Sequence, residues 1–476
     1  MAATTQYDAI IIGSGQGGGP LANAFAKAKK RTALIEKVHI GGCCVNEGCT
    51  PTKTMIASGR VAYLAHRAPD YGVQIPSQKG EKNEIAVNMT RVRQRKDDIV
   101  NAFRTGVEKG LKESGVDVLC GEASFVDAKT LKVAMLDGSE KLIRGHHIVI
   151  NTGARPAHPK TEGIEKIESG RVLDSTSIQE LDEVPRHLVI IGGGYVGVEF
   201  GQLFRRLGSD VTIVQRHTRI LPREDPDIAD TLLDILREDG VAVYTETTAA
   251  GVLSSSPEGF SLLLKTKFGM KTLTGATHLL LAAGRVPNTD ALNTEAAGIK
   301  TDGKGYIVCN EFLETSVPLI YGMGDVKGPP AFTHISYDDF RILKSSLLPS
   351  DSRLSIADRL VPNVVYTDPQ LAHVGLHEHE AREKHPEKKI MTAAMPMSSV
   401  ARALETDETR GMMKAVVDGV TGQILGFSCL GPEGGELMSV VEVAMIGHLP
   451  YQKLESAVFA HPSFAESLNN LWGFLK

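Results

Sequence analysis

The stretch Tyr7–Gly18, YDAIIIGSGQGG, joins a short apolar run to three glycines with the spacing G-x-G-x-x-G. A helical pattern, GPLANAFAKAKK, and a second apolar run ending at Glu36 follow it. In this strand–turn–helix–strand context, the spacing is typical of a dinucleotide-binding turn. Gly13 would permit the tight turn, Gly15 would let a pyrophosphate approach the backbone, and Gly18 would permit close helix packing. Glu36 is then expected to accept a hydrogen bond from a ribose hydroxyl.

A second turn of the same kind lies in His187–Pro222, HLVIIGGGYVGVEFGQLFRRLGSDVTIVQRHTRILP. An apolar strand leads into Gly192, Gly194 and Gly197, and a helical segment and another apolar strand follow. Glycine-rich turns also occur without ligands, but two complete strand–turn–helix–strand patterns in one chain are far more specific than one. We therefore predict two nucleotide-binding domains of α/β type.

The residues after the second fingerprint bear on the choice of nucleotide. The offset that separates the first glycine from the acid in the first copy leads here to Gln215, with Arg216 and His217 immediately after it. Loss of the acid and gain of cationic side chains is what a ribose 2′-phosphate requires, so this site is expected to prefer NADPH to NADH. The alternative is that these are ordinary surface charges and that the preference is weak.

Two cysteines, Cys44 and Cys49, stand in the segment Gly41–Lys53, GGCCVNEGCTPTK. Pro51 is tolerated in a first helical turn, so a helix is expected to begin here, where its N-terminus would stabilise a thiolate. Five helical residues rise about 7.5 Å, which is more than the ~7 Å that a disulfide tolerates between Cα atoms. A bond between these cysteines therefore requires residues 46–48 to be non-helical. Spacing alone leaves a redox pair, a metal site and chance proximity open.

Composition limits the class of protein. A chain of 476 residues exceeds one core and predicts two to four domains. The net charge of -5, with both signs interspersed, favours neither nucleic acid nor an acidic membrane surface as partner. We find no signal-peptide pattern and no apolar run near the ~18 residues of a membrane span. Six cysteines do not make a secreted disulfide framework, so we expect a soluble cytoplasmic protein in which a disulfide would be catalytic.

Other segments contribute single features. A polar break at Pro76–Glu84 is expected to interrupt a mainly helical region, and Gly115–Ile150 has the pattern of a small antiparallel meander. Asp325 lies in a glycine-flanked turn, where its carboxylate could hold the polyol chain of a cofactor. His461 and Glu466, near the end of the chain, would say little by themselves.

Taken together, these motifs resemble the flavin-dependent pyridine nucleotide–disulfide oxidoreductases: glutathione reductase, dihydrolipoamide dehydrogenase and mercuric reductase. The family pattern GG-T-C-x-N-x-G-C-x-P-[ST]-K is matched by Gly41–Lys53, except that Cys43 replaces the threonine. The remaining family motifs follow in the family's order: GGGYVGVE at Gly192–Glu199, GRVPN at Gly284–Asn288, MGD at Met323–Asp325 and HPSFAE at His461–Glu466. The resemblance covers nearly the whole chain.

This resemblance implies an α/β fold with two Rossmann-like domains and a C-terminal α+β dimerisation domain. It places an FAD-binding domain at residues 1–157 and 286–355, an NAD(P)H-binding domain at 158–285 and the dimerisation domain at 356–476. It further implies a homodimer in which each active site is shared across the interface. The first fingerprint would bind FAD and the second NADPH, with NADH as an alternative donor. Four residues outside the two fingerprints are expected beside the cofactors: Gly153, Gly284, Arg285 and Asp325.

The resemblance also assigns catalytic roles. Tyr195 would cover the nicotinamide pocket, and Lys53 would pair with Glu199 beside the flavin, where a cation stabilises negative charge on the reduced ring. Reduced flavin would pass two electrons to a Cys44–Cys49 disulfide.

Within that disulfide, Cys49 would lie nearer the flavin and Cys44 would attack the substrate. His461 from the partner subunit, oriented by Glu466, would take and return the thiol proton.

The terminal acceptor is less sharply indicated. Segments Val400–Lys414 and Phe459–Trp472 look closest to the mercuric-reductase-like branch, which favours a disulfide, a metal ion of the Hg(II) kind or a small thiol-reactive oxidant as acceptor. Mercuric reductases carry a C-terminal cysteine pair and often a leading metal-binding domain. This chain has no cysteine after Cys429 and begins at the flavin strand, so typical mercury handling is not expected.

Two other functions stay open: an NAD-linked dihydrolipoamide dehydrogenase, which Gln215 disfavours, and a binding flavoprotein with an idle redox pair. Cys43 would be a third thiol for a soft metal, a resolving thiol or a small filler. No resident metal site is expected.

Overall fold

The computed structural model describes residues 4–74, 85–357 and 359–476. The chain forms two compact units. Unit 1 comprises Met1–Met55, Arg91–Ala157 and Gly284–Arg359, and unit 2 comprises Ile56–Thr90, His158–Ala283 and Leu360–Lys476. The polar break expected at Pro76–Glu84 lies outside the described residues.

Unit 1 is built on a six-stranded sheet in which β1 lies between β2 and β5. Strands β3, β2, β1, β5 and β16 run parallel, as expected for buried strands joined by crossovers. The predicted meander is present as β3, β4 and β5, but the first half of β3 and the second half of β5 extend into the parallel sheet. The strands are β1 Thr5–Ile12, β2 Thr32–Glu36, β3 Asp117–Phe125, β4 Thr130–Met135, β5 Glu140–Ile150 and β16 Ile320–Gly322.

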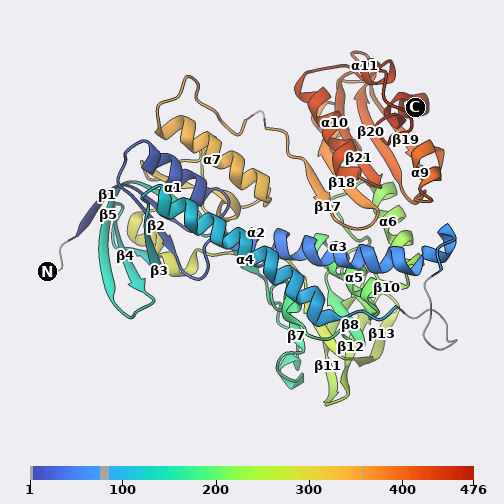
Figure 1. The fold of residues 1–476 in the computed structure, drawn as a ribbon, viewed down its shortest axis with the longest axis horizontal. Helices are drawn as coiled ribbons and strands as arrows, with labels where there is room; N and C mark the ends of the chain where they lie inside the picture. The colour runs from blue at the N-terminus through green and yellow to red at the C-terminus, as the bar shows by residue number, and fades with distance from the viewer. Residues whose placement is uncertain (1–3, 75–84, 358) are drawn as a thin grey trace. The chain divides into compact units, whose positions relative to one another are not determined.

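Alternate residues of β1 build the core on the two faces of this sheet, because strand side chains alternate with period two. Ala9 and Ile11 pack with Phe25 of helix α1 and Ile342 of α7. Ile10 and Ile12 pack on the opposite face. Helices α1 and α7 lie side by side over the sheet (Figure 1). The other elements of this unit are α1 Gly18–Lys27, α2 Gly42–Asn46, α7 Thr333–Leu347 and the two-stranded ribbon β6 Ala154–Pro156 with β15 Arg285–Pro287. Helices α3 Cys49–His66 and α4 Met89–Glu113 each have residues in both units.

Unit 2 contains a second parallel sheet, ordered β10-β9-β8-β14-β7, which carries the second fingerprint. An antiparallel sheet of three strands, β11 to β13, is also part of this unit. These elements are β7 Val172–Leu173, β8 His187–Ile191, α5 Tyr195–Leu207, β9 Asp210–Val214, α6 Pro226–Glu238, β10 Val241–Tyr244, β11 Thr248–Ser256, β12 Gly259–Thr266, β13 Gly269–Ala276 and β14 His278–Leu281.

The C-terminal part of unit 2 is an antiparallel sheet, ordered β17-β18-β21-β20-β19, against which α10 packs (Figure 1). Its elements are β17 Asn363–Val365, β18 Gln370–Gly375, α8 Glu378–Lys384, β19 Ile390–Pro396, α9 Ala401–Glu405, β20 Met412–Asp418, β21 Ile424–Gly431, α10 Gly434–Ile446, α11 Gln452–Glu455 and α12 Ser467–Asn470. The predicted α/β fold with an α+β C-terminal domain is confirmed, whereas the three domain boundaries stay a prediction. Among the described helices, none is long and apolar enough to cross a membrane.

Candidate active site

The first glycine turn is closed to any side chain at two positions. Gly13 has φ +102°, and a Cβ there would lie 2.3 Å from the Asn151 carbonyl oxygen. A Cβ on Gly18 would lie 2.1 Å from the Gly13 carbonyl oxygen. Gly15 is partly exposed, with the Asn151 side chain beside it. A bound pyrophosphate could therefore approach bare backbone at Gly15, and the turn fits the phosphate part of FAD.

Glu36 ends β2 next to this turn. Its Oε2 accepts hydrogen bonds from the Ser14 backbone N–H (3.0 Å) and hydroxyl (2.6 Å), and its Oε1 accepts from Val38 N–H. The Ser14 hydroxyl oxygen also accepts from Gly41 N–H at 3.0 Å, which ties the acid and the turn to the start of the cysteine segment. Sequence reasoning missed Ser14, which is simply the middle residue of a glycine turn.

Gly153 and Gly284 lie at the ends of the ribbon β6–β15. Both have positive φ, +68° and +123°, and a Cβ on either would meet no atom within 4 Å. The backbone carbonyls of these glycines accept hydrogen bonds from Asn288 and Ala157 respectively. The two predicted glycines therefore shape the ribbon while leaving open space beside it.

Arg285 and Asp325 lie close to Cys43 within unit 1. The Arg285 guanidinium donates to the Ala154 carbonyl and lies 3.5 Å from Cys43 Sγ. Burial raises the pKa of the Cys43 thiol, and Arg285 opposes that shift. Burial also raises the pKa of Asp325, against the charges of Arg285 and Lys327. Cys43 thus faces residues that are expected to hold the cofactor.

The two predicted redox cysteines flank a break in the helix. Helix α2 ends at Asn46 and α3 begins at Cys49, so residues 47–48 are non-helical as expected. Asn46, which was also expected to be non-helical, is instead the last residue of α2. Neither cysteine forms a disulfide in this structure. A hydrogen bond to Cys49 and burial raise the pKa of Cys44. The Thr333 hydroxyl lies 3.3 Å from Cys49 Sγ.

Thr333 and Asn46 were not singled out from the sequence. Thr333 is the first residue of α7, so this helix begins beside Cys49, where the helix dipole favours a thiolate. Asn46 donates to the Ile40 and Gly42 carbonyls and accepts from Arg104, which holds the short α2 in place. In the sequence, the only signs of these two roles were a threonine at the start of a helix and the asparagine of the C-x-N pattern.

The second glycine turn has the same constraints. Gly192 has φ +116°, and a Cβ there would lie 2.4 Å from the Ala282 carbonyl oxygen. A Cβ on Gly197 would lie 1.9 Å from the Gly192 carbonyl oxygen. A Cβ on Gly194 would meet no atom within 4 Å. The turn therefore fits the pyrophosphate of a pyridine nucleotide.

The residues after β9 match the expected loss of the ribose acid. Gln215 is buried, whereas Arg216 and His217 are exposed and adjacent, with Arg216 Nε donating to His217 Nε2 at 3.1 Å. Arg219 instead forms an ion pair with Asp230 at 3.0 Å. Arg216 is thus an exposed cation at the position where a 2′-phosphate is expected.

Tyr195 and Glu199 lie one helical turn apart at the start of α5. The Tyr195 hydroxyl donates to Glu224 Oε1 at 3.2 Å, and burial raises the pKa of Tyr195. Glu199 is buried and accepts from Tyr366 N–H at 2.8 Å. Lys53 belongs to unit 1, so its pairing with Glu199 stays a prediction.

His461 and Glu466 form a pair near the chain end. His461 Nδ1 lies 2.9 Å from Glu466 Oε2, and the histidine side chain is 67% exposed. The carboxylate can thus orient the imidazole and leave the other ring nitrogen for proton exchange.

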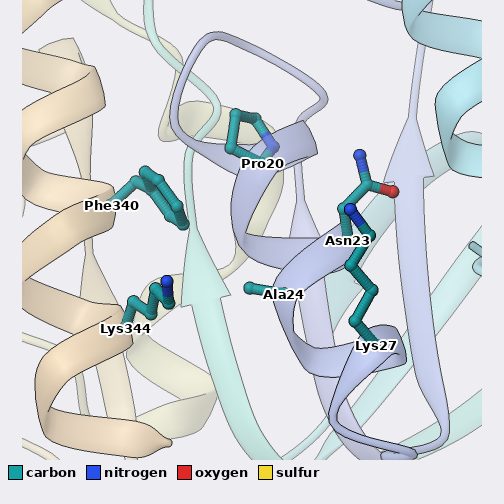
Figure 2. A pocket seen from close by; sticks show the side chains of 6 residues that line it. All are labelled: Pro20, Asn23, Ala24, Lys27, Phe340 and Lys344. Carbon is teal, nitrogen blue, oxygen red and sulfur yellow. The ribbon is translucent and has the colours of Figure 1, made fainter. Parts of the chain in front are cut away.

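A pocket of about 410 Å³ lies elsewhere, between α1 and α7 (Figure 2). Aliphatic and aromatic groups make up most of its wall, and two lysines reach its rim. It is lined by Pro20, Asn23, Ala24, Lys27, Phe340 and Lys344. None of these is a predicted site residue.

Comparison with known proteins defines the class. Residues 7–339 match the family "Pyridine nucleotide-disulphide oxidoreductase", and residues 361–471 match its dimerisation domain. The chain is 37% identical over 474 residues to the probable pyridine nucleotide-disulfide oxidoreductase RclA of Escherichia coli, covering 99% of this chain and 100% of that one. It is 35% identical over 466 residues to a mercuric reductase of Staphylococcus aureus, covering 97% and 81%.

A solved structure agrees in fold. The Cu(II) complex of the HOCl-induced flavoprotein disulfide reductase RclA from Escherichia coli superposes with a TM-score of 0.87 at 36% identity, covering 99% of this chain and 100% of that one. The two glycine turns fit the flavin and pyridine nucleotide that this family uses. The chain therefore belongs to the pyridine nucleotide-disulphide oxidoreductase family and is an oxidoreductase with the family's C-terminal dimerisation domain.

Proposed function

We propose that this protein is an NADPH-dependent flavoprotein reductase that passes two electrons through Cys44 and Cys49 to a disulfide, a thiophilic metal ion or a small thiol-reactive oxidant. The observation that carries this proposal is the hydrogen-bonded thiol pair across a helix break. FAD, when bound, would accept hydride from NADPH and deliver two electrons to the disulfide of these cysteines. The first glycine turn, Glu36 and Asp325 would hold it.

The thiol pair supports separate roles for the two cysteines. A hydrogen bond to Cys49 and burial raise the pKa of Cys44, which favours the protonated form of Cys44. Cys44 therefore needs a base before it can attack. His461 of the partner subunit, oriented by Glu466, is the proposed base, which makes the dimer necessary for turnover.

A disulfide substrate would be reduced by two successive thiol–disulfide exchanges. The Cys44 thiolate attacks one substrate sulfur, forms a mixed disulfide and releases the first thiol. Cys49 then attacks the Cys44 sulfur, which restores the internal disulfide and releases the second thiol. His461 of the partner subunit returns the proton taken from Cys44 to a departing thiolate.

The relatives support the class of acceptor. RclA has been solved as a Cu(II) complex and is described as HOCl-induced, and mercuric reductases are also similar to this chain. Cys43 contacts Arg285, so we propose that it faces the cofactor and takes no part in electron transfer. The three-domain division, the pairing of Lys53 with Glu199 and a cytoplasmic location belong to the same proposal.

Anaerobic reduction with NADPH and with NADH, followed by flavin absorbance, tests the relay. Uptake of about four electrons per chain is expected, two for the flavin and two for the disulfide. Cys44→Ser should still allow reduction by NADPH but abolish turnover on Hg(II), Cu(II), oxidised glutathione, lipoamide or hypothiocyanite. Cys120→Ser, at an exposed thiol of β3, and Cys43→Thr are matched controls that should keep turnover. Uptake of only two electrons by the native protein, or full turnover by Cys44→Ser, would contradict the proposal.

A further inference from the structure

Three buried side chains of unit 2 converge near Tyr195, a residue of the second glycine turn. Glu224 precedes α6, His373 lies in β18 and His377 immediately precedes α8. Their residues are only 5%, 4% and 8% exposed. One nitrogen or oxygen of each lies within 4.8 Å of the others. Three potential metal ligands from two distant stretches of sequence, one with Glu224 and one with both histidines, therefore lie close together.

The carboxylate of Glu224 is incompletely bonded. Oε1 accepts from the Tyr195 hydroxyl, whereas Oε2 is buried and has no hydrogen-bond partner among the described residues. His377 Nε2 lies 4.0 Å from Glu224 Oε2, a distance too long for a hydrogen bond. A buried carboxylate oxygen without a partner is costly, so this one indicates a missing ligand.

The spacing suits a metal ion. Zinc binds imidazole nitrogen and carboxylate oxygen at about 2.0–2.2 Å, so an ion between Glu224 Oε2 and His377 Nε2 needs only a small contraction of their 4.0 Å separation.

His373 must move to join them. Its ring stacks on His377 with centroids 3.8 Å apart and planes 11° apart, and parallel rings cannot both point a lone pair at one ion. Its Nδ1 lies 2.9 Å from Ser428 Oγ, and its Nε2 lies 3.1 Å from the Gly375 carbonyl. Ligation by His373 therefore exchanges the Gly375 contact for the ion and breaks the stack.

The neighbouring charged groups do not compete for this position. Asp225 is bonded by the Lys414 ammonium at 3.2 Å and by the Glu378 backbone N–H. His379 has a 61% exposed side chain and lies 3.8 Å from Asp225, outside the cluster. Two imidazoles and one carboxylate select a borderline divalent ion such as Zn(II) or Cu(II) over Mg(II) or Ca(II).

We propose that Glu224, His373 and His377 bind a divalent transition-metal ion of the zinc or copper type through three protein ligands, leaving a further position open. This proposal does not depend on the proposed function. Because Tyr195 donates to the other oxygen of Glu224, an ion there would also fix the acceptor of the Tyr195 hydroxyl.

The test uses the full-length, tag-free flavoprotein with Cys43, Cys44 and Cys49 changed to serine, so that thiolates cannot bind the probe. After chelator treatment, Zn(II) is titrated by calorimetry and counted by elemental mass spectrometry. One Zn(II) per chain is expected. Glu224→Gln and His377→Gln should each weaken binding at least about tenfold, since they remove a direct ligand. His379→Gln, two residues from His377 but exposed, should bind like the parent.

Stability and spectroscopy guard against misfolded variants. Zn(II) should raise the melting temperature of the parent and of His379→Gln but not of the ligand variants. X-ray absorption at the zinc edge of the parent should report two histidines and one oxygen donor from the protein. Absence of a bound ion in the folded parent, unchanged binding in both ligand variants, or loss of binding in His379→Gln would overturn the proposal.

Discussion

The two glycine turns share one backbone plan and differ in what surrounds it. In both, an added Cβ at the first glycine would strike a carbonyl at 2.3 to 2.4 Å, and one at the last glycine would strike the first glycine's carbonyl at 1.9 to 2.1 Å. The middle glycines differ, because the Asn151 side chain borders Gly15 whereas Gly194 has open space.

The acid position differs as well. Glu36 accepts three hydrogen bonds from the first turn and its neighbourhood, while Gln215 is buried and the exposed residues Arg216 and His217 follow it. The shared steric plan fits a pyrophosphate, and we propose that the flanking side chains determine which nucleotide binds. Substitutions at matched positions can separate these two contributions.

The largest effect is expected at the last glycines. Gly197→Ala puts a methyl 1.9 Å from a backbone oxygen, so the second turn must distort. We expect reduction by NADPH to slow by at least about 100-fold while FAD is retained. Gly18→Ala, the matching change in the first turn, should instead release FAD. Stopped-flow reduction and flavin content measure both effects, and loss of FAD in Gly197→Ala would show that the turns are not independent.

Next in size is the nucleotide preference. Arg216→Ala should lower kcat/KM for NADPH about 10- to 100-fold, the value of one charge-assisted phosphate contact, and leave NADH within about twofold. Lys37→Ala is the matched change after Glu36, where the lysine pairs with Glu122 at 2.7 Å. Steady-state kinetics with both donors should show no change for Lys37→Ala. Equal losses with NADPH and NADH in Arg216→Ala would refute a 2′-phosphate contact.

A smaller effect is expected from Asn151→Ala. Its side-chain amide donates to the Gly13 carbonyl at 3.2 Å, and the second turn has Ala282 at the matching place. Removing one hydrogen bond of this kind costs about 1 kcal/mol, so FAD should dissociate about fivefold more readily. Equilibrium flavin titration measures this, with an unchanged KM for NADPH as the internal control. A tighter FAD complex would show that the amide crowds the turn.

The smallest effect is expected on how the stability of the protein changes with pH. Burial lowers the pKa of His187 and His278. His187 begins β8 and His278 begins β14, and these two strands pair in the second parallel sheet. Below the ordinary value of 6.5 the unfolded chain binds protons that these folded histidines do not, so stability falls as pH falls through that range. The double variant His187→Gln/His278→Gln should flatten the decline in melting temperature between pH 7 and 5. A steeper decline would show that their lowered pKa values do not govern it.

Much of the fold was predictable from local patterns. Two strand–turn–helix–strand patterns indicated two parallel sheets, because glycine spacing and apolar runs are properties of neighbouring residues. The non-helical residues 47–48 followed from the reach of a disulfide, whereas the helical conformation of Asn46 did not. The extension of β3 and β5 from the meander into the first sheet did not, because strand pairing between distant segments leaves no local mark.

By itself, the sequence determined the family, the two nucleotide turns and the order of the motifs, since each rests on short-range steric and hydrogen-bonding needs. Only the tertiary structure placed Thr333 beside Cys49, turned Cys43 toward Arg285 and brought Glu224, His373 and His377 together. Those contacts join residues that lie far apart along the chain. Their energies depend on burial and orientation, which exist only once the sheets have packed.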